Sequence, residues 1–141
     1  PDQALELAQV STYGGHPVCC AAALANLEIL TRERLWENAA NVGDYLLQQL
    51  RGIDSPFLGE IRGKGLMIAV ELEDEEGNLL DAGRAAQVQG RIKQEGVLTG
   101  KMSHAAPGPE SILFLSPPLI LTAEEADRIV NAFRVAVESL S

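Results

Sequence analysis

The sequence predicts a two-layer domain of the α/β or α+β class, with helices packed on one side of a small β-sheet. Helix-type apolar spacing occupies the first third and the end of the chain, and short runs of β-forming residues occupy the middle. The resulting order is helix-helix-strand-strand-helix-strand-strand-helix. A chain of 141 residues has the length of one domain, or of one domain plus a segment of a neighbouring one, and can bury a core without disulfides or metal.

The N-terminal third predicts helices behind a loop. The loop, Ser11–Pro17, contains two glycines and ends on a proline, which suits the first turn of a helix. From Pro17 to Leu30 nearly every residue is apolar, so we expect a helix that is buried on most sides. One helix or two should follow between Arg32 and Arg51. The apolar stripe of this second stretch consists of Leu35, Ala39, Val42, Leu46 and Leu50.

Strand-type patterns begin after a breaker region at 52–56. Phe57–Ile61 and Leu66–Leu72 are rich in β-forming residues, and the four residues Arg62–Gly65 are expected to connect them. The acidic run Glu73–Asn78 predicts a turn. Two further short strands are expected at Val97–Thr99 and Ile112–Leu115. An exposed loop, Met102–Glu110, is expected between them.

Two more helices have recognisable ends. A helix over Ala82–Glu95 should be closed by Gly96. Its inner positions are expected at Ala86, at Val88 or Gln89, and at Ile92. The last helix should begin after Thr122, whose hydroxyl forms a capping box with the Glu125 carboxylate. The expected buried face of this helix consists of Ala126, Ile129, Val130, Phe133, Val137 and Leu140.

Composition narrows the functions open to the chain. There are 11 Lys and Arg residues against 20 Asp and Glu residues, which gives a formal net charge of −9. This balance argues against binding along a nucleic-acid backbone and leaves small-molecule and protein partners open. No apolar run is long enough to span a bilayer.

The start of the chain predicts a fragment or a processed chain, and its cysteines predict an intracellular protein. The chain begins with Pro1 rather than Met, and it lacks the basic and apolar regions of a secretory signal. Cys19 and Cys20 are adjacent, which suits neither a disulfide between them nor a metal site. We therefore expect a reduced, intracellular protein.

Most side chains that could carry chemistry have a simpler explanation. His104 is expected to be a solvated loop residue, and His16, just before a helix, to pack or cap rather than to transfer protons. The acidic run at 73–76 lacks the spacing of an EF-hand loop, so a solvated turn is favoured. The run Arg62–Gly65 can hold an anion, but a tight connection between strands explains its glycines equally well and is favoured.

The loop Ser11–Pro17 is the better functional candidate. A helix N-terminus leaves backbone N–H groups free and carries a positive partial charge. Ser11, Thr12 and two glycines just before it are the residue types of a phosphate site. On composition alone the signal has little specificity, because many helices follow Ser, Thr and Gly.

Three blocks of the sequence resemble the class III aminotransferases, fold-type I enzymes that use pyridoxal 5′-phosphate. They are Ser11–Leu30, Ile61–Leu72 and Leu115–Glu125, and they occur in the family's order with matching helices between them. The resemblance implies a small, mainly antiparallel sheet with helices packed on one face, as in the C-terminal small domain of these enzymes. Residues 16–141 would form that domain, and residues 1–15 would belong to the large cofactor-binding domain.

The resemblance also implies what the chain lacks. In the family, the lysine that forms the Schiff base lies upstream of the Ser11–Pro17 block, so none of Lys64, Lys93 and Lys101 is expected to be catalytic. The chain would be the C-terminal part of an enzyme that transfers an amino group from an amine or (ω-)amino acid to a keto acid. Alone it is expected to be inactive, and its parent to be a cytoplasmic homodimer. An aminomutase is another reaction within the family.

The resemblance assigns the cofactor-binding residues Ser11, Thr12 and Tyr13. The Thr12 hydroxyl would contact a cofactor phosphate that is held mainly by the partner subunit. The alternative is that this hydroxyl bonds its own backbone as the chain enters the helix.

The resemblance also assigns three substrate-side residues. Some family members clamp an α-carboxylate with an arginine where this chain has Phe114, and others carry a mobile arginine near Lys101. A lysine cannot form the bidentate contact of an arginine, so an amine or ω-amino substrate is favoured. Arg62 is either a further substrate-side cation or a structural residue.

A second interpretation is a free-standing acidic α+β module that binds a protein or a small anion. It predicts a complete gene product near this length and a soluble monomer. The enzyme interpretation instead predicts a long upstream reading frame with a lysine before Ser11.

Overall fold

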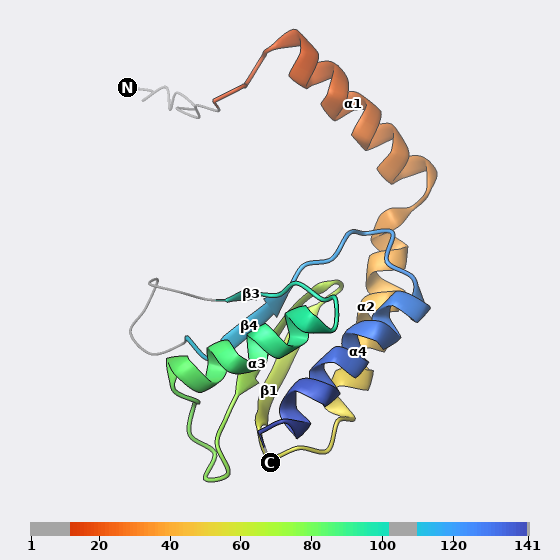
Figure 1. The fold of residues 1–141 in the computed structure, drawn as a ribbon. Helices are drawn as coiled ribbons and strands as arrows, with labels where there is room; N and C mark the ends of the chain where they lie inside the picture. The colour runs from red at the N-terminus through yellow and green to blue at the C-terminus, as the bar shows by residue number, and fades with distance from the viewer. Residues whose placement is uncertain (1–11, 102–109, 141) are drawn as a thin grey trace, which may run out of the picture. The chain divides into compact units, whose positions relative to one another are not determined.

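The computed structural model describes residues 12–101 and 110–140, in two compact units divided between Arg34 and Leu35 (Figure 1). The first unit contains helix α1 (Pro17–Arg32). The second unit contains α2 (Leu35–Arg51), β1 (Leu58–Lys64), β2 (Met67–Leu72), α3 (Ala82–Gln94), β3 (Gly100–Lys101), β4 (Ile112–Leu115) and α4 (Ala123–Glu138). This element order confirms the predicted one. The expected boundary between a large and a small domain at residue 15 stays a prediction.

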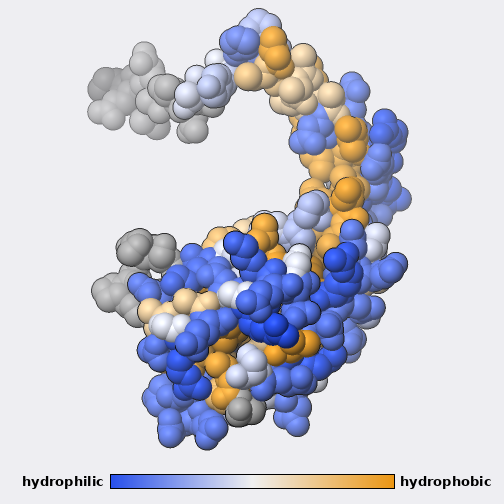
Figure 2. Space-filling view, in the orientation of Figure 1, coloured by the Kyte–Doolittle hydropathy of each residue, from blue (hydrophilic) through white to orange (hydrophobic). Residues whose placement is uncertain are grey.

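Helix α1 is apolar and exposed along its length. Pro17 occupies its first position, and the left-handed backbone of Arg34 (φ 50°) interrupts the helical stretch before α2 begins. None of its residues is buried, and Val18 and Leu24 are 70% and 62% exposed. Figure 2 shows orange, hydrophobic surface over part of this helix. The helix is therefore exposed in the chain by itself, and its expected burial, against the large domain or a dimer partner outside this chain, stays a prediction.

The four strands form one antiparallel sheet in the order β1-β2-β4-β3. Helices α2, α3 and α4 pack on one face of this sheet (Figure 1). Side chains alternate along β2, so Ile68, Val70 and Leu72 enter the core, whereas Met67 is 73% exposed on the other face. The expected small antiparallel sheet with helices on one face is confirmed.

A two-residue turn joins β1 and β2. Lys64 pairs with Met67, so only Gly65 and Leu66 form the turn, and Gly65 is left-handed (φ 54°). The four-residue connection expected from the sequence is wrong, because its first three residues extend β1. The turn lies against α2, where a Cβ added at Gly43 would come within 2.6 Å of the Gly65 Cα. Helix and turn therefore meet backbone to backbone at these two glycines.

Helix α3 ends where the sequence predicts, but one of its inner positions differs. Gly96 follows it with a φ of 85°, as expected of a C-terminal glycine. The prediction of Ala86 is wrong, because this residue is exposed and Ala85 is buried in its place. The buried residues follow steps of three and four, at Ala85, Val88 and Ile92.

The short strand after α3 begins later than expected. Val97–Thr99 is not a strand, because the Gln89 side chain of α3 donates a hydrogen bond of 2.9 Å to the Thr99 carbonyl and holds this segment against the helix. Strand β3 consists only of Gly100 and Lys101. Residues 102–109, including His104, lie outside the described residues.

Helix α4 confirms the capping box. The Thr122 hydroxyl accepts a hydrogen bond of 3.2 Å from the Glu125 N–H, and the Glu125 carboxylate accepts one of 2.9 Å from the Thr122 N–H. The predicted buried face holds, except that Leu140 is half-buried, and Ala132 and Ala136 extend it. Within residues 12–101 and 110–140, no helix has the length and apolar character needed to cross a membrane.

Candidate functional site

The turn in front of α1 contains Thr12 and Tyr13, two of the three predicted cofactor-binding residues. The third, Ser11, lies outside the described residues. Residues 12–15 are all exposed, and the left-handed backbone of Gly15 (φ 77°) leads the chain into the helix. The turn therefore offers a hydroxyl and a flexible backbone at an open helix N-terminus.

The first turn of α1 lacks a side-chain cap. His16 occupies the capping position, but its side chain is exposed and makes no capping hydrogen bond, so the packing or capping role predicted for it is wrong. The first intrahelical bond runs from the Cys20 N–H to the His16 carbonyl at 2.9 Å. The N–H groups of Val18 and Cys19 precede this bond and have no acceptor within the helix. They leave a positive partial charge at this end.

A row of residues crosses the open face of the sheet, which the helices leave uncovered. Strand pairing aligns Arg62 of β1 with Ala69 of β2, Phe114 of β4 and Gly100 of β3. The ring of Phe114 lies over Gly100, where an added Cβ would overlap it. Gly100 therefore provides the space for this ring, and the Phe114 side chain stays 42% exposed.

Two cavities meet at Phe114. The smaller, of about 410 Å³, lies on the open face of the sheet, and Arg62 is the one charged residue in its otherwise largely apolar lining. The larger, of about 530 Å³, is bounded by residues 96–100, by the segment that leaves β4 at Ser116–Pro118 and by the start of α4. Phe114 lines both cavities, so its size determines the shape of each.

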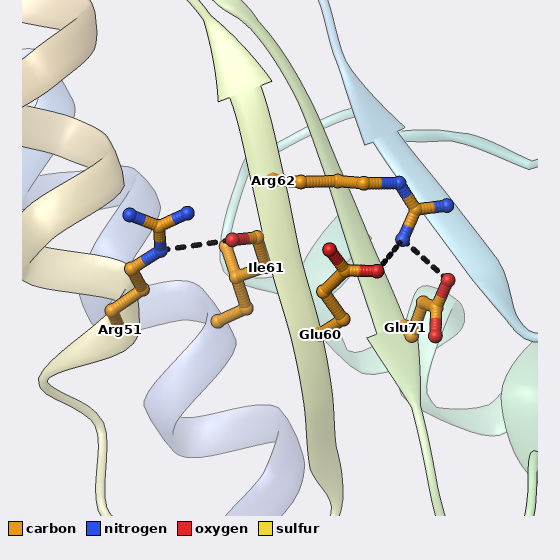
Figure 3. Close-up of polar contacts among 5 residues, drawn as sticks. All are labelled: Arg51, Glu60, Ile61, Arg62 and Glu71. Atoms are coloured by element: carbon orange, nitrogen blue, oxygen red, sulfur yellow. Dashed lines mark hydrogen bonds and ion pairs between the residues drawn. The ribbon is translucent and has the colours of Figure 1, made fainter.

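Arg62 is held by two carboxylates (Figure 3). Its guanidinium forms ion pairs with Glu71 and, at 2.8 Å, with Glu60. The hydrogen bond to Glu71 is the main cause that raises the pKa of Arg62 above its usual value. These contacts favour the structural interpretation of Arg62 over an anion cradle. In the same view, Arg51 of α2 donates from Nε to the Ile61 carbonyl at 2.9 Å.

Lys101 is separate from the two cavities. It pairs with Leu113 of β4, which is fully buried, so the register gives Lys101 the helix-covered face of the sheet and Phe114 the open face. The Lys101 ammonium lies 3.6 Å from the Glu110 carboxylate. The fold thus brings Arg62 and Phe114 together at one cavity and does not bring Lys101 to them.

The acidic turn between β2 and α3 is closed by its own hydrogen bonds. The Asp74 carboxylate accepts from the N–H groups of Asn78 at 2.8 Å and Glu76 at 3.1 Å. These bonds, chiefly that from the Asn78 backbone, lower the pKa of Asp74. In the described parts of the chain, no three His, Cys, Asp or Glu side chains gather to hold a metal ion.

Sequence reasoning missed Asn38. Its Nδ2 donates to the Leu119 carbonyl at 2.7 Å and to the Leu121 carbonyl at 3.0 Å, across more than eighty residues of sequence. The sequence does contain an indication that Asn38 is unusual. It lies three residues after Leu35 and four before Val42, so it is a polar residue on the apolar stripe of α2. The partner could not have been found from sequence, since it lies in an irregular segment.

Comparison with known families identifies what this fold belongs to. The model of the family "Aminotransferase class-III" matches residues 2–137. The chain therefore belongs to the class III aminotransferase family. The resemblance seen in the sequence is confirmed, and the alternative of an unrelated acidic module does not account for a match over nearly the whole chain.

Curated relatives agree with this assignment. An uncharacterised aminotransferase of Bacillus subtilis (strain 168) is 34% identical over 134 residues, covering 93% of this chain and 30% of the relative. The acetylornithine aminotransferase of Methanosarcina acetivorans is 36% identical over 126 residues, covering 89% of this chain and 28% of the relative. The chain thus spans less than a third of the length of these relatives.

Solved structures show the same fold. An aminotransferase of Bacillus anthracis superposes with a TM-score of 0.86 at 35% identity, covering 98% of this chain and 32% of that one. A PLP-bound amine transaminase from an uncultivated Pseudomonas species superposes with a TM-score of 0.81 at 39% identity, covering 96% of this chain and 30% of that one. The small antiparallel sheet with its covering helices is therefore an aminotransferase substructure.

Proposed function

We propose that this chain is the C-terminal part of an enzyme that transfers an amino group from an amine or (ω-)amino acid to a keto acid. The observation that carries the proposal is the family match over residues 2–137. The chain spans less than a third of its relatives, which supports the view that the reaction needs polypeptide beyond these residues. A cytoplasmic homodimer is the parent that we propose.

We propose pyridoxal 5′-phosphate as the cofactor of the parent, where it supplies an electron sink for the carbon that loses the amino group. Thr12 would donate its hydroxyl to the phosphate, with the backbones of Ser11 and Tyr13 beside it. The exposed turn and the N–H groups of Val18 and Cys19, which have no acceptor within the helix, fit an anion. Residues 12–19 contain no Lys or Arg, so neutralisation of the phosphate falls to the partner subunit.

None of the three lysines is proposed as the Schiff-base residue. Lys64 lies in β1 and Lys93 in α3, and both side chains are exposed. Lys101 pairs with Glu110 at the edge of the sheet. None of them lines the two cavities at Phe114, which supports a chain that is inactive alone.

On the substrate side, we propose that Phe114 and Arg62 line the entrance, with Lys101 as a more distant point charge. Arg62 is already paired with two carboxylates, and Phe114 offers an apolar ring. Among the described residues that line the smaller cavity, no cation is left unpaired to clamp an α-carboxylate. This arrangement supports an amine or ω-amino substrate over an α-amino acid.

Amino transfer is tested on the complete reading frame that contains this chain. The complete protein, loaded with pyridoxal phosphate, should transfer amino groups from a panel of amines to a keto acid, and the 141-residue chain should not. A complete protein without any transfer activity would refute the proposed function. Transfer by the short chain alone would refute the assignment of the reactive lysine to other polypeptide.

The role of Thr12 is tested by cofactor retention in the complete protein. Thr12→Ala should weaken retention of pyridoxal phosphate about tenfold, because it removes one hydrogen bond to a charged group, and Thr12→Ser should restore it. Thr31→Ala is the matched control, since its hydroxyl bonds the Leu27 carbonyl at the other end of α1. Equal retention in the Thr12→Ala and Thr31→Ala proteins would contradict this role.

A further inference from the structure

The Asn38 side chain connects α2 to the segment that follows β4. Both of its acceptors, at Leu119 and Leu121, are carbonyl oxygens, so only the amide NH₂ can face them and its two hydrogens serve one acceptor each. The side chain is half-buried on the helix. This contact is a clamp, in which one amide group holds two backbone carbonyls that are separated by a single residue.

The clamped segment has few means of holding itself in place. Residues 116–121 form no helix or strand, and Pro117 and Pro118 carry no N–H group. Its one internal backbone bond is a turn, in which the Leu121 N–H donates to the Pro118 carbonyl at 3.0 Å. Removal of the Asn38 donor therefore frees the Leu119 and Leu121 carbonyls, and the buried Leu121 side chain is then the main remaining attachment of that turn.

The same segment forms a wall of the larger cavity. Ser116, Pro117, Pro118 and Leu121 line the cavity together with Phe114, whereas Asn38 does not. We propose that Asn38 is a positioning residue: it fixes the wall formed by 116–121 and thereby sets which amine donors fit beside Phe114. This inference rests on the proposed aminotransferase function, and it adds a residue that acts on substrate choice without touching substrate.

One variant of Asn38 and two control variants of α2 separate this role from a merely structural one. Asn38→Asp keeps the shape of the side chain but replaces the donor with a carboxylate, which repels both carbonyls. Tyr45→Phe removes another long-range contact of α2, the 2.6 Å hydrogen bond from the Tyr45 hydroxyl to Asp127 of α4. Asn41→Ala removes an exposed amide on the same helix.

Hydrogen exchange of the Leu121 amide in the 141-residue chain tests the clamp. Asn38→Asp should lower the protection of this amide about tenfold or more, as expected when two hydrogen bonds are lost. Tyr45→Phe and Asn41→Ala should leave the protection of the Leu121 amide, relative to the amides of α4, unchanged. Unchanged protection in the Asn38→Asp chain overturns the proposal.

Substrate choice in the complete enzyme tests the consequence. Asn38→Asp should change the ratio of kcat/KM between a bulky and a small amine donor at least fivefold, mainly through KM, and Tyr45→Phe should not. If Leu121 loses protection but this ratio stays the same, Asn38 is only structural and the inference fails while amino transfer stands. If the unmodified enzyme transfers no amino group, the proposed function itself fails and the specificity role fails with it.

Discussion

Gly43→Ala is expected to destabilise the unit Leu35–Ser141, although alanine is the better helix former. The added Cβ would lie within 2.6 Å of the Gly65 Cα and would overlap the Gly65 carbonyl, and these are backbone atoms of a tight turn that cannot rotate away. Overpacking of this kind costs up to about 3 kcal/mol, whereas replacing a helical glycine with alanine returns about 1 kcal/mol. The free energy of unfolding should therefore fall by about 2 kcal/mol in total.

Thermal and urea unfolding measure this loss, with Gly90→Ala as the matched control. Gly90 is an exposed glycine of α3 with nothing within 4 Å of an added Cβ, so its substitution should stabilise the chain by up to about 1 kcal/mol. For a unit of this size, 2 kcal/mol corresponds to a fall in Tm of about 10 °C. A Gly43→Ala chain as stable as the Gly90→Ala chain would show that α2 and the β1–β2 turn do not meet at Gly43 and Gly65.

Three further predictions concern hydrogen bonds at the ends and sides of helices. Thr122→Ala should cost about 1 kcal/mol in urea unfolding, because it removes the cap of α4. Hydrogen bonds from Thr122, chiefly from its backbone N–H, lower the pKa of Glu125. Their contribution to folding stability is therefore present above the ordinary carboxyl pKa and is lost as the pH falls through the lowered pKa. Glu125→Gln should abolish this loss of stability in acid. The hydrogen bond to Asp127 is the main cause that raises the pKa of Tyr45, so Asp127→Asn should bring it back towards its usual value in a spectrophotometric titration. An unchanged tyrosine titration would argue against that contact.

The elements with strong local signals were predictable from the sequence. The capping box at Thr122, the terminal glycine Gly96 and the strand Ile112–Leu115 each depend on residues within one or two turns of the chain. The apolar face of α4 was found for the same reason, since its spacing is strictly helical. The family resemblance added the antiparallel pairing, which no periodicity specifies.

The errors arose where a distant contact decides the outcome. Val97–Thr99 contains β-forming residues, but the Gln89 side chain binds its last carbonyl and the strand starts later. The turn after Lys64 is shorter than its glycines suggest, because Gly63 remains in register with Ile68. Local propensity cannot anticipate either contact.

The candidate site was predictable in its residue types and not in its arrangement. The charge of Arg62 is visible in the sequence, but its neutralisation depends on the pairing of β1 with β2, which brings Glu71 beside it. Lys101 and Phe114 are both near the sheet edge, and only the register shows that they take opposite faces. The clamp by Asn38 joins residues more than eighty positions apart, beyond any local pattern.

The contact between Arg51 and Ile61 also bears on how the protein behaves when concentrated. Among the described strands β1 pairs only with β2, so its outer edge faces no other described strand and offers backbone groups to a strand of a second molecule. Because the turn makes Lys64 and Met67 a hydrogen-bonded pair and such pairs alternate, the Ile61 carbonyl points outward. The Arg51 guanidinium already occupies that oxygen. An incoming chain must first displace a charged donor, so the bond that attaches α2 to the sheet also discourages edge-to-edge aggregation.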